Sequence, residues 1–86
     1  MKKLIFESAA SEDIVYWTQT DIKTLKKIIQ LIESVDKTPF SGLGKPEPLK
    51  HGLKGFWSRR INDVDRLVYK VTDNEIFISS CRYHYD

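Results

Sequence analysis

Three side chains in this sequence could divide the work of cleaving RNA without a metal ion: the carboxylate of Glu47, the guanidinium of Arg66 and the imidazole of His84. RNA carries its own nucleophile, because its 2′-hydroxyl can attack the adjacent phosphorus when a base, an acid and positive charge are supplied. An unperturbed imidazole titrates near about pH 6.5, whereas a guanidinium stays charged and can hold two phosphate oxygens. We therefore treat Glu47 as the candidate base, with Arg66 and His84 supplying charge and a proton.

Positive charge concentrates around Glu47. Residues 1–44 carry equal numbers of acidic and basic side chains, so the net charge of +2 comes from the second half of the chain. Between residues 45 and 60, Glu47 is the only acidic residue, and the basic ones are Lys45, Lys50, Lys54, Arg59 and Arg60, with His51 beside them. Such a patch suits a polyanion. A solvated, lysine-rich loop and strand that binds nothing would have the same composition.

Composition excludes several other classes of protein. A chain of 86 residues closes one core, and no apolar run approaches the roughly 20 residues that a membrane span needs. Cys81 is the only cysteine, and with two histidines it is too little for a structural zinc site, so we expect neither a metal nor another cofactor. The first residues lack the apolar stretch of a secretory signal, which predicts a cytoplasmic location.

The first half of the chain reads as a scaffold. An apolar run at 4–6 predicts a short strand, and Ser8 or Ser11 could cap a helix that places Ala10, Ile14 and Trp17 on one side. A second helix, with Asp21 as its N-cap, should end near Asp36, before Thr38-Pro39. Its apolar stripe is predicted to face the core and consists of Ile22, Leu25, Ile28, Ile29, Ile32 and Val35.

Glu47 lies in a connector, residues 39–55, that is rich in proline and glycine. Pro46 and Pro48 flank Glu47 and restrict the backbone on both sides, so a stiff segment would present the carboxylate. Alternatively, the two prolines only terminate the preceding helix. The spacing of the prolines does not distinguish between these readings.

The last third of the chain predicts an antiparallel meander, with strands at 53–61, 66–71 and 76–83 and turns at Asn62-Asp63 and Asp73-Asn74. With the N-terminal strand this makes four. We therefore expect an α+β fold in which two N-terminal helices pack on one face of a small, twisted, antiparallel-dominated sheet. The other face would be open to water or ligand.

The predicted hairpin around Asp73-Asn74 brings Arg66 and His84 to the same end of the sheet. If its loop holds three residues, Arg66 faces Arg82 and His84 points to the same side, whereas a loop of two residues sends His84 to the other face. A bulge, or a strand that ends before His84, would relax this rule. The sequence leaves these alternatives open.

Several stretches, in this order, carry a resemblance to a known family. They are Thr38-Pro39-Phe40, Gly44-Lys45-Pro46-Glu47-Pro48-Leu49-Lys50-His51, Leu53-Lys54-Gly55-Phe56-Trp57-Ser58-Arg59-Arg60-Ile61, Arg66-Leu67-Val68-Tyr69 and Cys81-Arg82-Tyr83-His84-Tyr85, joined by Tyr16-Trp17 and Thr20-Asp21 in the helical half. With them the chain resembles, over nearly its whole length, the YoeB toxins of bacterial type II toxin–antitoxin systems, part of the RelE-like group. The resemblance implies a RelE-like, microbial-ribonuclease-like fold.

The resemblance also implies an activity: a ribosome-dependent, metal-independent endoribonuclease that cuts mRNA at the ribosomal A site and inhibits translation. Glu47 would be the general base, Arg66 would stabilise the pentavalent phosphorane, His84 would protonate the leaving 5′ oxygen and Tyr85 would shape the site. The predicted contacts to mRNA or the ribosome are Lys50, His51, Lys54, Arg59 and Arg60. One departure is Asp86, since these toxins commonly end at the tyrosine after the histidine, and its added negative charge could weaken RNA binding.

The implied partners are the 70S ribosome with mRNA and a YefM-like antitoxin whose acidic, disordered segment would fold over the basic site. The family also implies a homodimer, and we predict a heterotrimer with an antitoxin dimer. The alternative is a non-catalytic module of the same fold, either an RNA-binding protein or a relative of the ParE-like proteins that act on DNA gyrase. Those ParE-like relatives lack the Glu, Arg and His set that is present here.

Overall fold

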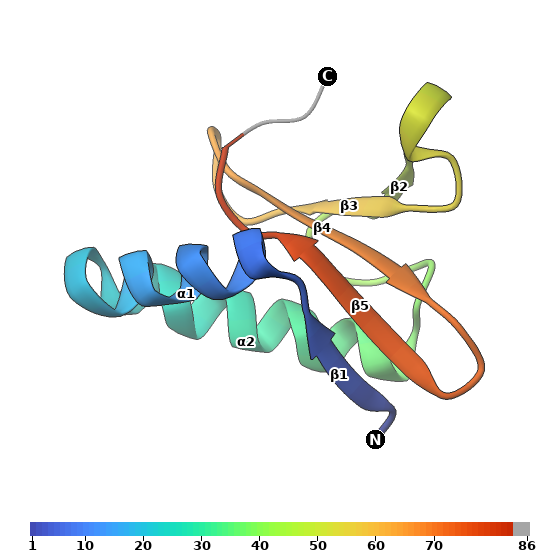
Figure 1. The fold of residues 1–86 in the computed structure, drawn as a ribbon, viewed down its shortest axis with the longest axis horizontal. Coiled ribbons are helices and arrows are strands. Elements are labelled where there is room, and N and C mark those ends of the chain that lie inside the picture. The colour runs from blue at the N-terminus through green and yellow to red at the C-terminus, as the bar shows by residue number, and fades with distance from the viewer. Residues whose placement is uncertain (84–86) are drawn as a thin grey trace.

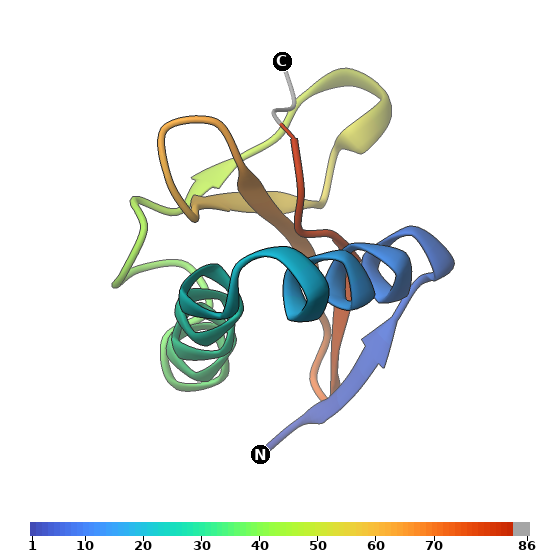
Figure 2. The same ribbon diagram turned by 90° about the vertical axis from the view of Figure 1, so that its left-hand side faces the viewer.

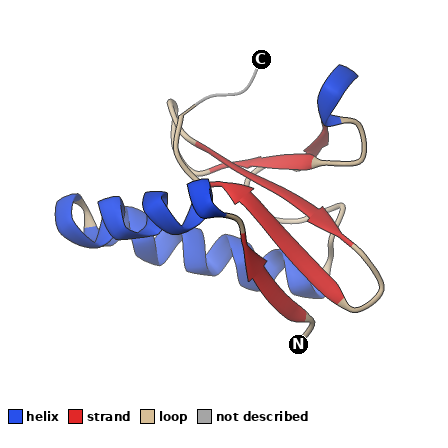
Figure 3. Cartoon of the chain, in the orientation of Figure 1, coloured by secondary structure: helices blue, strands red, loops and turns tan. Residues whose placement is uncertain are grey.

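The structure, a computed structural model, describes residues 1–83. Its elements are β1 (Lys3–Phe6), α1 (Ser8–Thr20), α2 (Ile22–Lys37), β2 (Glu47–Pro48), a 3₁₀ helix (His51–Leu53), β3 (Trp57–Arg60), β4 (Arg66–Val71) and β5 (Glu75–Ser80). The strands form one sheet in the order β1-β5-β4-β3-β2 (Figures 1 and 3). Because β1 is parallel to β5 and the other pairs are antiparallel, the sheet is mixed but dominated by antiparallel pairing.

Both helices pack on the same face of the sheet, as Figures 1 and 2 show from two directions. The core between the layers comes mainly from α2, β4 and β5 and includes Ile28, Leu31, Val35, Leu67, Tyr69, Ile76 and Ile78, all fully buried. The predicted α+β architecture, with both helices on one face of the sheet, is therefore confirmed. On the other face, Glu47 is exposed, whereas Ser58, Val68 and Ser80 are buried. In the described part of the chain, no helix combines the length and the apolar character needed to cross a bilayer.

The predicted limits of α2 are close to the observed ones. The Asp21 side chain caps it, accepting hydrogen bonds from the backbone N–H groups of Lys23 (3.1 Å) and Thr24 (3.2 Å). The helix ends at Lys37, because Thr38 precedes a proline. The prediction that the whole apolar stripe faces the core is wrong for two residues. Ile22 and Ile29 are each 50% exposed, since they lie at the margin of the stripe rather than over the sheet.

The serine cap predicted for α1 is also wrong. Ser8 is already the first helical residue, Glu7 takes the N-cap position, and its side chain makes no capping hydrogen bond. The predicted apolar side of α1 is confirmed, because Ala10 and Trp17 are buried and Ile14 packs against the core. Trp17 is thus a core residue.

The sheet has five strands rather than the predicted four. The additional strand, β2, holds only Glu47 and Pro48 and lies at the edge of the sheet, the position where a strand tolerates proline. The strand predicted at 53–61 is confined to β3, because a 3₁₀ helix occupies 51–53 and Gly55 takes a positive φ of 97°.

The β4–β5 hairpin has a loop of two residues, Asp73-Asn74, because the N–H of Thr72 donates to the carbonyl of Glu75 (2.9 Å). Near the turn Val71 pairs with Ile76, but beyond an irregularity at Val68/Tyr69 the partner of Val68 is Ser80, one residue further along β5. This bulge shifts the pairing by one residue, so the loop length alone no longer decides which face of the sheet a residue beyond the bulge points to. The strand predicted to reach residue 83 ends at Ser80, and His84 lies outside the described residues.

Candidate active site on the open face of the sheet

Glu47 and Arg66 lie on the face of the sheet that the helices leave open. Glu47 pairs with Ser58, Ser58 with Val68 and Val68 with Ser80, so these four residues form one row across β2, β3, β4 and β5. Paired residues of an antiparallel sheet point to the same side, and residues two apart on a strand do so as well. Arg66 therefore shares the face of Val68, while its neighbour Leu67 points into the core.

The register also sets how far apart the two side chains start. Glu47 and Arg66 are separated by two strand spacings across the sheet and by two residues along it, which places their Cα atoms about 12 Å apart. Two long side chains that start at this separation on one face can converge on a single phosphodiester. The structure thus places two members of the predicted catalytic set on the same face of the sheet.

Within residues 1–83, the guanidinium of Arg66 has two hydrogen-bond acceptors. Its Nη1 donates to the carbonyl oxygens of Asn62 (3.3 Å) and Asp65 (3.4 Å), both long hydrogen bonds, and the residue is 9% exposed. A guanidinium has five N–H donors, so these two contacts within residues 1–83 use only part of its donor capacity. Arg60 pairs directly with Arg66 across β3 and β4, and its side chain is exposed.

Backbone hydrogen bonds fix Glu47 to the edge of the sheet from both sides. The N–H of Arg60 donates to the carbonyl of Gly44 (2.7 Å), and the N–H of Leu49 donates to the carbonyl of Phe56 (2.9 Å). The side chain of Glu47 is exposed. Since α2 has already ended at Lys37, the reading in which the prolines around Glu47 terminate the helix is wrong.

The segment that precedes His84 is held by side chains far away in the sequence. Asp13 accepts the N–H of Cys81 (3.0 Å), the indole N–H of Trp17 donates to the carbonyl of Cys81 (2.8 Å), and Asp65 accepts the N–H of Tyr83 (2.7 Å). The backbone is therefore fixed up to residue 83. His84 and Tyr85 lie outside the described residues, so their places in the site stay predictions.

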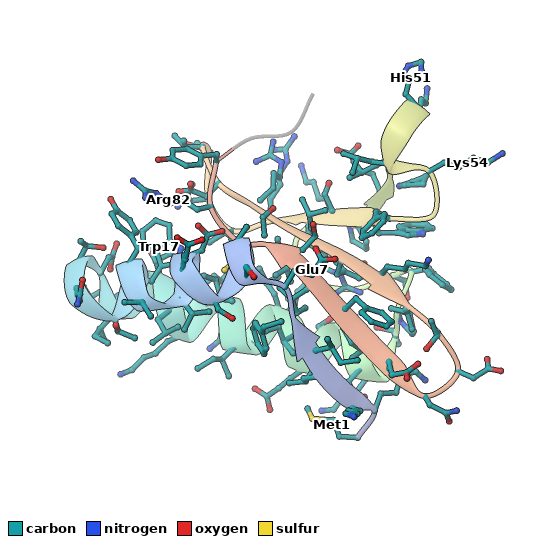
Figure 4. All side chains as sticks on the ribbon, viewed as in Figure 1. Met1, Glu7, Trp17, His51, Lys54 and Arg82 are labelled. Carbon is teal, nitrogen blue, oxygen red and sulfur yellow. The ribbon has the colours of Figure 1, made fainter. Side chains whose placement is uncertain are left out.

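Arg82, which the sequence analysis did not single out as a site residue, stacks between two aromatic rings. Its guanidinium carbon lies 3.4 Å from the centroid of the Tyr16 ring on α1 and 4.5 Å from that of Tyr83. Figure 4 shows Arg82 beside α1, close to Trp17. A planar cation over aromatic faces stabilises this turn, and an Arg-Tyr pair near the chain end was its only sequence signal.

Four of the predicted RNA-contacting residues are exposed. Lys50, His51 and Lys54 lie on the connection between β2 and β3, and Figure 4 shows His51 at its tip and Lys54 pointing away from the body of the protein. Arg60 is exposed on the open face. Because their side chains are exposed, these four residues are free to contact RNA as far as their burial is concerned, and the contact itself stays a prediction.

Arg59 does not fit the role of an RNA contact, and its assignment is corrected. It is fully buried on the helix side of the sheet, because the alternation along β3 turns it away from Arg60. All five of its N–H donors have acceptors within the protein. No part of its guanidinium is left to reach a phosphate.

The described residues contain no group of three or more His, Cys, Asp or Glu side chains that could hold a metal ion.

Burial raises the pKa of the Cys81 thiol to about 12, with the nearby carboxylates of Asp13 and Asp65 acting in the same direction. Cys81 is fully buried and belongs to the hydrophobic core.

Comparison with known proteins defines the class to which this fold and site belong. The family model of the YoeB-like toxin of bacterial type II toxin–antitoxin systems matches residues 6–85. The protein therefore belongs to the class of toxins from type II toxin–antitoxin systems. Toxin YoeB of Escherichia coli K12 is 55% identical over 83 residues, which cover 96% of this chain and 99% of the relative. The chain belongs to the YoeB-like toxin family.

Solved structures agree with the sequence comparison. The YoeB dimer from Staphylococcus aureus matches with a TM-score of 0.93 at 49% identity, covering 98% of each chain. A chain of the heterotetrameric YoeB–YefM toxin–antitoxin complex from the same species matches with a TM-score of 0.91 at 49% identity, covering 99% of each chain. The resemblance inferred from the sequence motifs is confirmed.

Proposed function

We propose that this toxin is a ribosome-dependent endoribonuclease that cleaves mRNA in the A site without a metal cofactor and so inhibits translation. The observation that carries the proposal is the placement of Glu47 and Arg66 on one open face, with Arg60 directly opposite Arg66. A carboxylate beside two guanidinium groups suits a reaction in which a proton is removed while negative charge grows on a phosphorus centre.

The proposed reaction uses the substrate's own 2′-hydroxyl. Glu47 takes its proton, the 2′ oxygen bonds to phosphorus, and Arg66 stabilises the additional charge of the pentavalent phosphorane. His84 gives a proton to the 5′ oxygen as its bond to phosphorus breaks, leaving a cyclic 2′,3′-phosphate on one fragment and a free 5′-hydroxyl on the other. Tyr85 shapes the site next to His84.

Substrate binding is assigned to the exposed basic side chains around this face. Lys50, His51 and Lys54 project from the connection after Glu47, and Arg60 lies beside Arg66. Positive charge of this kind attracts the RNA backbone irrespective of base sequence. The 70S ribosome would then select the codon by presenting it in extended form, and the toxin would act in the cytoplasm.

The partners follow from the relatives. We propose that the chain forms a homodimer and binds a YefM-like antitoxin, because YoeB from S. aureus is described as a dimer and in a complex with YefM. The complex from S. aureus is heterotetrameric, whereas the sequence analysis predicts a heterotrimer. Light scattering on the purified toxin–antitoxin pair would decide which stoichiometry applies here.

The test is a cleavage assay on ribosomes programmed with a defined mRNA, at a Mg²⁺ concentration that keeps the 70S ribosome intact. The wild-type chain should cut the A-site codon, and His84→Gln or Glu47→Gln should each slow cleavage by about 10² to 10⁴-fold while leaving the fold intact. RNA binding without cleavage would instead indicate the non-catalytic RNA-binding module. Inhibition of gyrase without an effect on mRNA would indicate the ParE-like alternative.

A further inference from the structure

The segment between α2 and Glu47, residues 38–46, contains no helix or strand, yet it fixes where Glu47 enters the sheet. A chain of this length without regular structure has no hydrogen-bond ladder of its own, so its polar backbone groups need other partners. Many of these partners come from one side chain, that of Arg59.

Arg59 reaches from β3 under this segment and binds it at three carbonyl groups. Its Nη2 donates to the carbonyl oxygens of Thr38 (2.6 Å) and Ser41 (2.7 Å), and its Nη1 donates to that of Leu43 (3.1 Å). Nη1 also donates to the hydroxyl of Ser34 on α2 (2.7 Å). A single planar group thus ties the loop to β3 and to the end of α2.

Tyr69 on β4 extends the same network. Its hydroxyl accepts the fifth donor of Arg59, Nε, at 3.0 Å and donates to the carbonyl of Pro39 at 2.8 Å. Burial raises the pKa of Tyr69 in spite of the opposing effect of Arg59, so the phenol keeps the proton that it donates to Pro39. All of the acceptors of Arg59 are neutral hydroxyl or carbonyl oxygens, and three of them are carbonyls of the 38–46 segment. The buried positive charge of Arg59 is therefore solvated by the protein only while this segment is in place.

Two glycines let the loop approach this network closely. A side chain at Gly42 would come within 2.8 Å of the Ser34 hydroxyl, and one at Gly44 would come within 3.0 Å of the backbone oxygen of Arg60. Both glycines also have positive φ angles, 105° and 81°. The carbonyl of Gly44 then accepts the N–H of Arg60, three residues before Glu47.

We propose that Arg59, together with Tyr69, is a positioning residue for catalysis: it fixes the 38–46 segment and thereby the place of the Glu47 carboxylate on the opposite face of the sheet. The proposal deepens the proposed function and rests on it. Two neighbouring arginines divide two tasks, because Arg60 faces the substrate while Arg59 orders the chain that carries the base.

The test compares Arg59→Lys, which keeps the charge but cannot serve five acceptors, and Tyr69→Phe, which removes only the hydroxyl. We expect the single-turnover rate on saturating programmed ribosomes to fall on the order of 10²-fold for Arg59→Lys and about tenfold for Tyr69→Phe, since small misplacements of a catalytic group carry such losses. RNA affinity should change little. Ile78→Val, a core change of modest cost on β5, serves as the stability control and should keep the wild-type rate.

A double-mutant cycle separates positioning from a general loss of stability. In the Glu47→Gln background, Arg59→Lys should cause no further loss of rate, because the group that it positions is already absent. A rate loss that is equally large with and without the Glu47 carboxylate would overturn the proposal, as would a loss confined to RNA affinity.

A second readout does not depend on catalysis. The backbone amide of Leu43, which donates to the Ser34 hydroxyl at 3.3 Å, should lose protection from hydrogen exchange in both variants, and the amide resonance of Glu47 should shift. Unchanged protection and an unchanged Glu47 resonance would refute the positioning role even in a protein that cleaves RNA. If the wild-type chain cleaves no RNA, the proposed function fails, and these two amides alone decide whether Arg59 orders the segment.

Discussion

Arg60 and Arg66 are paired directly across β3 and β4, and both point to the open face of the sheet. Like charges at directly opposite positions destabilise a sheet. Local arrangements that oppose stability are characteristic of functional sites, where a ligand restores the balance. A phosphodiester between the two guanidinium groups would neutralise this repulsion, as the proposed RNA substrate requires.

This relationship predicts that Arg60 contributes mainly to affinity. Arg60→Gln should weaken the binding of single-stranded RNA and reduce the slope of log affinity against log salt by about 0.7, the value for one phosphate contact on a single strand. Fluorescence anisotropy at several salt concentrations measures both quantities. The midpoint of thermal unfolding should not fall, because a repulsive pair is removed. An unchanged salt slope would show that Arg60 contacts no phosphate.

Arg66 should contribute mainly to the rate. Arg66→Lys keeps the positive charge but loses the planar fork that can hold two phosphoryl oxygens, so the exchange is not conservative at such a site. We expect single-turnover cleavage on programmed ribosomes to slow by about 10² to 10³-fold, as when one donor to a developing charge is removed. The circular dichroism spectrum serves as the control for folding. A lysine variant that cleaves at the wild-type rate would remove Arg66 from the mechanism.

The two halves of the chain differ in how far the sequence predicts their structure. Both ends of α2 are set by local signals, since Asp21 caps its first turn and Pro39 follows its last residue, Lys37, by two positions. Such signals act between neighbours in sequence and can be recognised without tertiary structure. The exposed Ile22 and Ile29 show the limit of this approach, because the width of the buried stripe depends on what packs against it.

The contrast between Arg59 and Arg60 shows what a count of charges cannot reveal. Both residues belong to the same basic cluster in sequence, yet the alternation along β3 buries one and exposes the other. The partners of Arg59 come from the irregular segment between α2 and β2, whose backbone geometry no periodic pattern describes. The burial of Arg59 and its contacts with the loop could therefore be recognised only from the register of the sheet and the path of that loop.

The bend after β5 was unpredictable for a similar reason. The alternating apolar pattern continues through Cys81. The backbone of Cys81, however, is hydrogen-bonded to the side chains of Asp13 and Trp17 of α1, more than 60 residues earlier in the chain. Contacts over such a sequence separation leave no local signal. The placement of His84 accordingly stays a prediction from the family resemblance.

Asp65 offers a test of this C-terminal anchoring. Its carboxylate is 7% exposed and accepts hydrogen bonds from the Tyr83 N–H (2.7 Å) and from the side-chain amide of Asn62 (3.0 Å). Asp65→Ala leaves these donors without their partner, which should lower the free energy of unfolding by about 1 to 3 kcal/mol. Cleavage should slow as well, since the residue after Tyr83 is the candidate acid His84.

Urea unfolding measures the stability change, and hydrogen exchange at the Tyr83 amide measures the loss of anchoring. Asp63→Ala is the matched control, because Asp63 lies in the same turn with its side chain exposed, and we expect neither quantity to change. An Asp65→Ala variant with an undiminished protection factor at Tyr83 would contradict the anchoring role.

The buried thiol of Cys81 predicts a loss of stability at alkaline pH. Burial raises the pKa of Cys81 from about 9 to about 12 in the folded protein, so between these values the folded state binds more protons than the unfolded state. The free energy of unfolding should therefore be unaffected by this group below about pH 9 and should fall as the pH rises towards 12. The raised pKa of Tyr69 acts in the same direction above its ordinary value of 10.0.

Cys81→Ala separates the contribution of the thiol from that of the phenol. Urea unfolding of the wild type and of this variant at several pH values between about 8 and 11 should give curves that converge as the pH rises, because only the wild type loses the protonated thiol as a stabilising group. The thiol should also resist alkylation by iodoacetamide near pH 8 until urea unfolds the chain, since the thiolate is the reactive form. Parallel stability curves, or rapid alkylation of the folded protein, would show that Cys81 is not held protonated in the core.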